Sequence, residues 1–291
     1  MSKTLDALAL SHPCFSTGSK SHKGRVHLPV SPGCNIQCHF CDRRLNDIDR
    51  RPGVAAAILT PQEAAETVRK AVALCPDITV AGVAGPGETL ATPYALETFR
   101  LIRAAFPDII TCMSTNGLLL PDFADALAEL GIDALTVTVN AVDPALQAQI
   151  CGSVSYHGRR YEGRDAAEIL IRNQLAGIRR AAAAGITVKV NTVLIPEINA
   201  DHVPEVAKAV SGAGAKLYNI IPLIPQHRLA WCSAPGCALI SRTRAEAEHY
   251  LKVFRHCQRC RADAAGIPGG KDVSGELYSH PVRPENTFSH G

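Results

Sequence analysis

A short apolar run followed by three closely spaced cysteines opens the regular part of the chain, where residues 24–41 read GRVHLPVSPGCNIQCHFC. The run from Arg25 to Val30 is apolar and partly β-branched, which is typical of a buried strand. Cys34, Cys38 and Cys41 follow with the spacing C-x3-C-x2-C, so they fall in the loop directly after that strand. The sequence therefore predicts that three thiols gather at one end of a strand.

Short apolar runs then alternate with helical runs as far as Pro222. The predicted strands are Arg25–Val30, Asp77–Ala84, Ile109–Ser114, Ala134–Asn140, Ile186–Val193 and Leu217–Pro222. The predicted helices are Pro61–Leu74, Pro93–Ala105, Pro121–Leu130, Ala166–Ala184 and Ala200–Val210, with a last one near Thr243–Phe254. Nearly continuous apolar strands are expected where helices cover a parallel sheet. The alternation predicts an α/β fold, either a wound sheet or a partly closed barrel.

Particular residues mark the predicted helix ends. Thr60 before Pro61 and Thr92 before Pro93 suit an N-cap followed by proline in the first turn. Gly131 and Gly185 stand where helices stop before the next strand.

Three stretches fall outside this alternation. Met1–Lys23 is a polar leader, Asp143–Arg164 is a long insertion, and the tail from Gly266 has little periodicity, so we expect its end to be disordered. We therefore expect a cluster-binding leader over residues 1–24, a barrel over 25–230 and a C-terminal extension over 231–291.

The composition is that of a globular protein with an excess of cysteine. The 291 residues are 46% hydrophobic and 20% charged, which excludes a disordered or collagen-like chain. The net charge of +3 gives no reason to expect nucleic acid or a membrane as partner. No signal peptide or membrane span is predicted, so we expect a cytoplasmic protein. Thiols stay reduced there, so 11 cysteines indicate metal or redox chemistry.

The cysteine triplet suits an iron–sulfur cluster. Three thiolates can each bind one iron of a 4Fe–4S cubane and leave the fourth iron open to a substrate or cofactor. Phe40 would form an apolar wall beside the cluster. The alternative is a structural zinc site, although zinc usually shows paired C-x2-C half-sites and a fourth ligand.

At this triplet the chain resembles the radical S-adenosylmethionine (SAM) superfamily, whose signature is C-x3-C-x-aromatic-C. The resemblance implies a partial (β/α)6 barrel, in which the open iron binds SAM and an electron from the cluster cleaves SAM to a 5′-deoxyadenosyl radical. Gly85, Gly87 and Glu88, in the segment Gly85-Pro86-Gly87-Glu88, resemble the family's Gly-Gly-Glu element, which meets the SAM amino group. Glu88 is accordingly the predicted catalytic residue, positioning SAM or taking protons.

Polar residues near later strand ends extend the predicted SAM site. Ser114, Asn116, Asn140 and Asn191 could reach a ribose or a carboxylate there, because barrel sites are built at the C-terminal face. Each of them, taken singly, is better explained as a helix cap or a turn residue.

Further cysteines narrow the resemblance to the NifB family of nitrogenase cofactor synthases, over roughly residues 10–270. They are Cys14 in the leader and the C-x2-C pair Cys257 and Cys260. This resemblance implies an enzyme that fuses two 4Fe–4S clusters around a carbide derived from a SAM methyl group. The chain resembles the short, core-only form of the family. The implied partners are iron–sulfur cluster donors and cofactor carrier or scaffold proteins of nitrogenase assembly.

The resemblance also implies ligands for the two substrate clusters. Cys257 and Cys260 would anchor one cluster, and Cys14, His27 and Cys112 would hold the other. Cys112 in an apolar strand and His27 are also suited to simple core positions. One departure affects the ligand set, because some family members carry a further cysteine a few residues after the triplet, where this chain has none.

Several residues receive no functional role. Cys75 and Cys151 are interpreted as packing thiols and His39 as a variable position. No role is assigned to Cys232 and Cys237. Arg159, Arg160 and Tyr161 are interpreted as part of a solvated loop that could reach the cavity mouth. Two other functions stay open: another radical SAM enzyme with auxiliary clusters, such as a peptide-modifying maturase, or a non-catalytic iron–sulfur carrier or scaffold.

Overall fold

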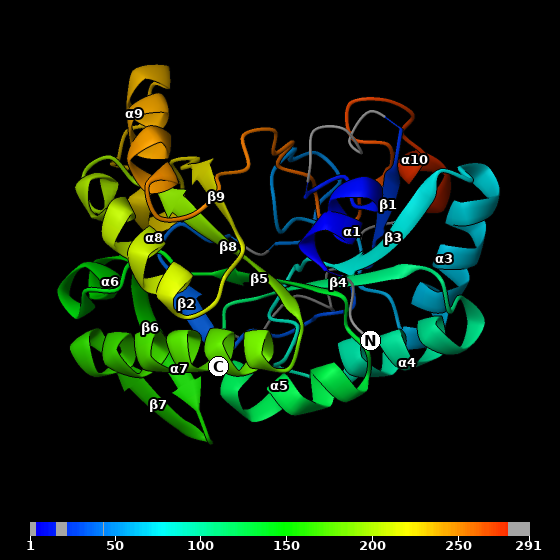
Figure 1. Ribbon diagram of the computed structural model, residues 1–291, viewed down its shortest axis with the longest axis horizontal. Coiled ribbons are helices and arrows are strands. Elements are labelled where there is room, and N and C mark those ends of the chain that lie inside the picture. The colour runs from blue at the N-terminus through cyan, green and yellow to red at the C-terminus, as the bar shows by residue number, and fades with distance from the viewer. Residues whose placement is uncertain (1–3, 16–21, 43, 279–291) are drawn as a thin grey trace.

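The computed structural model describes residues 4–15, 22–42 and 44–278 and shows a curved, mainly parallel sheet with helices along its outer side (Figure 1). The sheet contains, in spatial order, β10 (Ala265–Gly266), β1 (Gly24–His27), β3 (Ile78–Val83), β4 (Ile110–Thr115), β5 (Ala134–Thr138), β8 (Thr187–Leu194) and β9 (Leu217–Pro222). All neighbours from β1 to β9 are parallel, and β10 pairs antiparallel with β1. The predicted partial (β/α)6 barrel is confirmed.

The outer helices bury the main hydrophobic core against this sheet. They are α3 (Pro61–Leu74), α4 (Tyr94–Ala105), α5 (Leu120–Glu129), α7 (Gly163–Ala183) and α8 (Val203–Gly212), with the 3-10 turn η1 (Ala200–His202) before α8. Phe99, Ile102 and Leu127 are fully buried in this core. The packed Cys75 also lies there, as expected.

The predicted helix-end residues are confirmed with one exception. Thr60 and Glu63 form a reciprocal capping box at the start of α3. Gly131 and Gly185 follow α5 and α7 with φ of 76° and 89°, the left-handed conformation in which helices commonly end. Thr92, however, does not cap α4, because Pro93 itself occupies the N-cap position.

The leader contains a helix that the sequence analysis did not predict. Helix α1 (Leu5–Ser11) lies on the concave side of the sheet (Figure 1). Its Leu8, together with Phe15, packs against residues near the first positions of several strands, among them Val80, Ile110 and Leu217. Helix α1 therefore closes the amino-terminal end of the half-barrel from inside.

The long insertion consists of a helix and two strands, so the interpretation of Arg159, Arg160 and Tyr161 as part of a loop is wrong, although both arginines are exposed to solvent. It forms α6 (Pro144–Ile150) and the strands β6 (Cys151–Tyr156) and β7 (Arg159–Glu162), which join β2 (Ile36–Cys38) in a second, antiparallel sheet. Asp143 caps α6, and the hairpin turns through His157 and Gly158, both with positive φ. The side chains of Arg159 and Arg160 stand on the exposed edge strand β7, so they do not line the cavity described below.

The last predicted helix is displaced towards the N-terminus. It forms as α9 (Cys237–Glu248), after the 3-10 turn η2 (His227–Leu229), and the short α10 (Ser274–Leu277) follows later. After a turn at residues 249–251 the chain runs alongside β9, where Val253 forms a parallel bridge with Tyr218 and the Phe254 N–H bonds to the Tyr218 carbonyl at 2.7 Å. This brings Phe254 to the concave side, beside Phe15.

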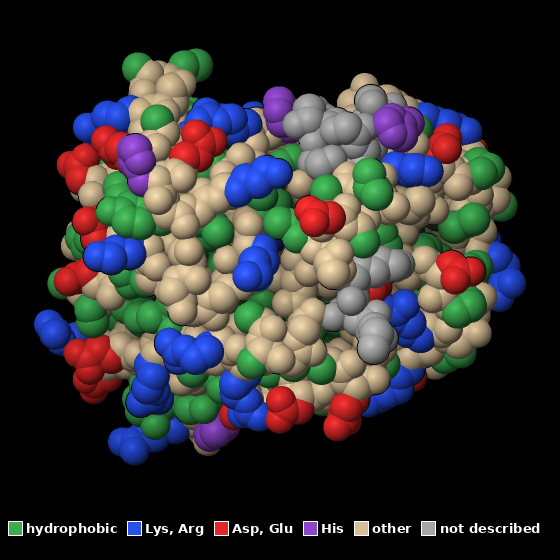
Figure 2. Space-filling view, viewed as in Figure 1, with side chains coloured by type: hydrophobic (Ala, Val, Ile, Leu, Met, Phe, Trp, Pro, Cys, Tyr) green, Lys and Arg blue, Asp and Glu red, His purple; other side chains and the backbone are tan. Residues whose placement is uncertain are grey.

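The remaining expectations concern the tail and membranes. The end of the tail, residues 279–291, lies outside the described residues. Among the helices that the structure does describe, none is long and apolar enough to span a membrane. Acidic and basic side chains are interspersed on the face shown in Figure 2.

Candidate active site

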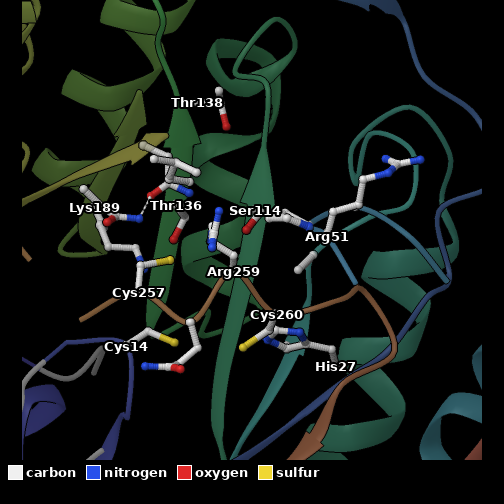
Figure 3. Close-up of a pocket in the computed structure, with 18 of the residues that line it drawn as sticks. Cys14, His27, Arg51, Ser114, Thr136, Thr138, Lys189, Cys257, Arg259 and Cys260 are labelled. Carbon is white, nitrogen blue, oxygen red and sulfur yellow. Dashed lines mark hydrogen bonds between the residues drawn. The ribbon is translucent and has the colours of Figure 1, made fainter. Parts of the chain in front are cut away.

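The concave side of the half-barrel contains a cavity of about 330 Å³. Its walls come from strands β1, β3, β4, β5, β8 and β9, from the end of the leader, and from the segment after α9. Figure 3 shows the sulfur atoms of Cys14, Cys257 and Cys260 turned toward a common space. The lining includes every predicted ligand of the two substrate clusters and one cysteine of the triplet: Cys14, His27, Cys41, Cys112, Cys257 and Cys260.

The triplet forms a compact group of half-buried thiols at the edge of this cavity. The Cys41 N–H bonds to the Cys38 carbonyl at 3.2 Å, which keeps the loop tight. The pKa of the Cys38 thiol is raised well above its usual range by a hydrogen bond with Cys151, by burial, and by the neighbouring Cys41 and Cys34. Cys34 and Cys41 thus lie near Cys38, as the predicted cluster site requires. Within residues 4–15, 22–42 and 44–278, no three His, Cys, Asp or Glu side chains could hold a single metal ion.

Cys151 is a neighbour of the triplet that sequence reasoning missed. It is the Cα partner of Cys38 where β2 pairs with β6, and its side chain is 1% exposed. The packing interpretation is consistent with this burial, but the contact with Cys38 depends on a strand pairing that no local pattern indicates.

The turn containing Gly85, Gly87 and Glu88 packs directly on the loop before Cys34. The N–H groups of Gly87 and Glu88 bond to the carbonyls of Ser31 at 2.9 Å and Gly33 at 2.7 Å. A Cβ atom at Gly87 would lie 2.0 Å from the Gly33 oxygen, so only glycine allows this approach. The turn therefore fixes the start of the cysteine loop.

Glu88 joins this turn to the end of β4. Its carboxylate, 3% exposed, accepts hydrogen bonds from the Thr115 hydroxyl and from the Asn116 N–H, the latter at 2.6 Å. The Asn116 side-chain nitrogen then lies 4.0 Å from the Cys34 sulfur. Through these contacts Glu88 positions Asn116 beside the triplet. Because Glu88 itself is not among the cavity-lining residues, its catalytic role stays a prediction.

The other predicted SAM residues divide into two groups. Ser114 and Asn191 line the cavity, and Asn191 accepts a hydrogen bond from Asn219 at 3.1 Å. Asn140 is buried, and its side-chain oxygen accepts the Val193 N–H at 2.9 Å, which joins the end of β5 to β8. The structure therefore brings only the first group to the cavity.

His27 has the arrangement of a ligand imidazole. Its Nδ1 lies 2.9 Å from the Arg261 carbonyl, which assigns the proton to Nδ1 and leaves the Nε2 lone pair available. Burial, followed by the nearby Arg25, lowers the pKa of His27 to about 4, so the ring is neutral at physiological pH. Gly82 lies in register between His27 and Cys112 and leaves space between their side chains.

The C-x2-C pair is brought to β1 by the last strand of the sheet. Strand β10 pairs Gly266 with Arg25, whose guanidinium donates to the Cys260 sulfur at 3.1 Å. The ion pair between Arg261 and Asp263, 2.8 Å between Nε and Oδ1, holds the intervening loop. Cys257 and Cys260 thus lie across the cavity mouth from the strands.

Cys14 in the leader and Cys112 in β4 both line the cavity. Burial raises the pKa of the Cys14 thiol, and burial raises the pKa of Cys112 to about 12. In both cases the Lys189 ammonium group opposes the effect of burial. Sequence reasoning missed Lys189, although Thr187, Lys189 and Asn191 alternate with apolar residues in β8 and so mark one polar face.

Comparison with known proteins identifies the class of protein. Residues 28–210 match the Radical SAM superfamily. The fold is similar to that of SuiB from Streptococcus suis, solved with S-adenosylmethionine, with a TM-score of 0.58 at 14% identity over 80% of this chain and 51% of that one. The chain belongs to the radical SAM superfamily, whose enzymes use a 4Fe–4S cluster and SAM.

Curated relatives define the family more narrowly. The FeMo cofactor biosynthesis protein NifB of Methanocaldococcus infernus is 42% identical over 281 residues, covering 96% of this chain and 93% of that protein. NifB of Klebsiella pneumoniae is 42% identical over 286 residues, covering 96% of this chain and 61% of that protein. Within the superfamily the chain therefore belongs to the NifB family, which acts in nitrogenase cofactor assembly.

Proposed function

We propose that the chain fuses two 4Fe–4S clusters and inserts a carbide derived from SAM, which makes the precursor of the nitrogenase cofactor. One observation carries this proposal: a single cavity is lined by all five candidate ligands of the two substrate clusters and by Cys41 of the triplet. A radical SAM enzyme that needed only its own cluster would not require this second set of ligands.

The triplet would hold the resident cluster. Cys34, Cys38 and Cys41 fit it because they are half-buried and lie within one short segment, before, at the end of and after strand β2. When bound, the cluster supplies the electron that cleaves SAM. Gly87 and Glu88 fix the loop, and Asn116 approaches the Cys34 sulfur.

The walls of the cavity next to the triplet would bind SAM. Ser114 and Asn191 provide polar groups there. Gly85 and Gly87 are proposed to shape the site through the backbone, and Asn140 through the hydrogen bond that its side chain accepts from Val193. Helix α1 and the extended segment at Phe254 close the half-barrel and exclude water from reactive groups.

The substrate clusters would occupy the two remaining ligand sets. Cys257 and Cys260 would hold the cluster that receives the first methyl group on a sulfide. Cys14, Cys112 and the Nε2 atom of His27 would hold the other. A cluster that must fuse with another and then leave is best held by a small number of protein ligands. A neutral imidazole also binds iron more weakly than a thiolate does.

The partners follow from this chemistry. We propose that the chain receives clusters from iron–sulfur donor proteins and passes its product to a carrier or scaffold protein of nitrogenase assembly. The many cysteines suit the reducing conditions of the cytoplasm.

A double variant tests the proposed function. We expect Cys257→Ala/Cys260→Ala to keep the resident cluster and to bind SAM, but to form no S-adenosylhomocysteine, because the acceptor sulfide is absent. Slow formation of 5′-deoxyadenosine should continue. The measurement follows both products and the nitrogenase-activating product anaerobically, with Cys75→Ala as the matched control. Undiminished S-adenosylhomocysteine or active precursor from the double variant would favour another radical SAM activity, and a wild-type chain without 5′-deoxyadenosine would favour a carrier.

A further inference from the structure

Lys189 is a buried cation at the cavity wall. It lies in the middle of β8, is 7% exposed, and is one of the residues that line the cavity. Figure 3 shows it on the same side of the cavity as Cys14 and Cys257. None of the proposed steps uses this side chain.

Two aromatic rings surround the ammonium group. Its nitrogen lies 5.2 Å from the ring centre of Phe15 and 5.9 Å from that of Phe254, distances at which a ring face attracts a cation. No ion pair between Lys189 and a carboxylate is found in the part of the chain that the structure describes. A buried charge without a counterion is costly, so this position favours the arrival of an anion.

The shorter of these two contacts lies beside Cys14, a proposed ligand of one substrate site. Phe15, whose ring centre lies 5.2 Å from the ammonium nitrogen, directly follows Cys14 in the chain. The other substrate site has its own cation, because Arg25 donates to the Cys260 sulfur at 3.1 Å. One buried basic residue, Lys189, therefore lies beside Cys14, and another, Arg25, donates to Cys260.

We propose that Lys189 is the charge-compensating residue of the site formed by Cys14, His27 and Cys112, where its ammonium group donates hydrogen bonds to an anionic iron–sulfur substrate cluster. This inference rests on the proposed function. A cation beside the cluster favours its reduced, more negative state and raises its reduction potential, since charge and hydrogen bonds to the sulfurs set that potential.

Three variants test the role of the charge. Lys189→Met removes the charge but keeps an unbranched apolar chain between two phenylalanine rings, so the fold should persist. Lys189→Arg keeps the charge. Lys208→Met removes a lysine from the exposed side of α8 and is the matched control.

The reduction potential of the site's cluster is the main measurement. That cluster is identified by its nitrogen coupling in pulsed paramagnetic resonance and followed during an anaerobic redox titration. In Lys189→Met we expect the ratio of reduced to oxidised cluster at a fixed potential to fall at least about tenfold, which corresponds to about 59 mV. Lys189→Arg and Lys208→Met should resemble the wild type.

The outcomes separate this inference from the proposed function. Full iron content with an unshifted potential in Lys189→Met overturns the inference. If Lys189→Met loses iron, retention in Lys189→Arg supports the role of charge, and equal loss in both overturns it. Cys14→Ala/Cys112→Ala tests the site itself: loss of about four irons per chain supports a cluster there, and no loss overturns the proposed function and this inference together.

Discussion

The ion pair between Arg261 and Asp263 should decide whether the C-x2-C pair can hold a cluster. The two side chains are only 10% and 7% exposed. Asp263 also accepts the Ala56 N–H at 2.8 Å, and Arg261 donates to the Asn46 carbonyl at 2.9 Å. The pair therefore fastens the loop after Cys260 to the loop before α3, and the Arg261 carbonyl orients His27.

We expect Asp263→Ala to destabilise the protein substantially. The substitution leaves the Arg261 guanidinium nearly buried without its counterion, and breaking such a pair costs about 3–5 kcal/mol. Because Arg261 keeps its carbonyl acceptors, we expect the lower end, about 3 kcal/mol. Without the ion pair, the loop after Cys260 should become mobile and the cluster at Cys257 and Cys260 should be lost. The iron content should therefore fall by about four irons per chain.

Anaerobic urea unfolding of the cluster-free protein measures the first effect, and iron analysis after reconstitution measures the second. Glu168→Ala is the matched control, because its ion pair with Arg164 is exposed, with side chains 71% and 51% accessible for Arg164 and Glu168. It should cost less than about 1 kcal/mol. If Asp263→Ala behaves like this control and retains its iron, the ion pair does not organise the site and the reasoning is wrong.

Three further outcomes are expected. Replacing any one of Cys34, Cys38 or Cys41 by Ala should abolish reductive SAM cleavage while circular dichroism stays unchanged, and near-normal cleavage in any variant would contradict the triplet assignment. Pulsed paramagnetic resonance should show a nitrogen coupling to a reduced cluster that disappears in His27→Ala; a coupling that survives would place the ligand elsewhere. Gly87→Ala should displace the cysteine loop, because the added Cβ would lie 2.0 Å from the Gly33 oxygen. For a displacement near 1 Å, the rate of SAM cleavage should fall at least about tenfold. An unaffected rate would show that the loop accommodates the methyl group.

The sequence was most informative where structure is local. Helix α3 has the predicted bounds Pro61–Leu74, because its cap and its proline lie within the helix's own sequence. Helix α1 was missed since seven residues are too few for a clear periodicity, and its stability comes from Leu8 packing inside the half-barrel. Strands β6 and β7 were missed because pairing with β2, far away in sequence, stabilises them.

In the site, too, local sequence patterns were predictive, whereas contacts between distant segments were not. The C-x3-C-x2-C spacing predicted the cysteine triplet, whereas Cys14, His27 and Cys112 were expected as ligands only through the family resemblance. The structure brings these three residues to one cavity. The contact between Arg25 and Cys260 could not be predicted, because it depends on β10 pairing with β1 across more than two hundred residues.

The iron content of the anaerobically reconstituted protein tests the central claim most directly. One resident and two substrate clusters predict about twelve irons per chain, with about eight remaining when Cys34, Cys38 and Cys41 are all replaced by Ala. Mössbauer spectroscopy should show these irons as 4Fe–4S clusters. A fully reconstituted, folded protein with about four irons, all lost on replacing the triplet, would contradict the claim that this cavity holds two substrate clusters.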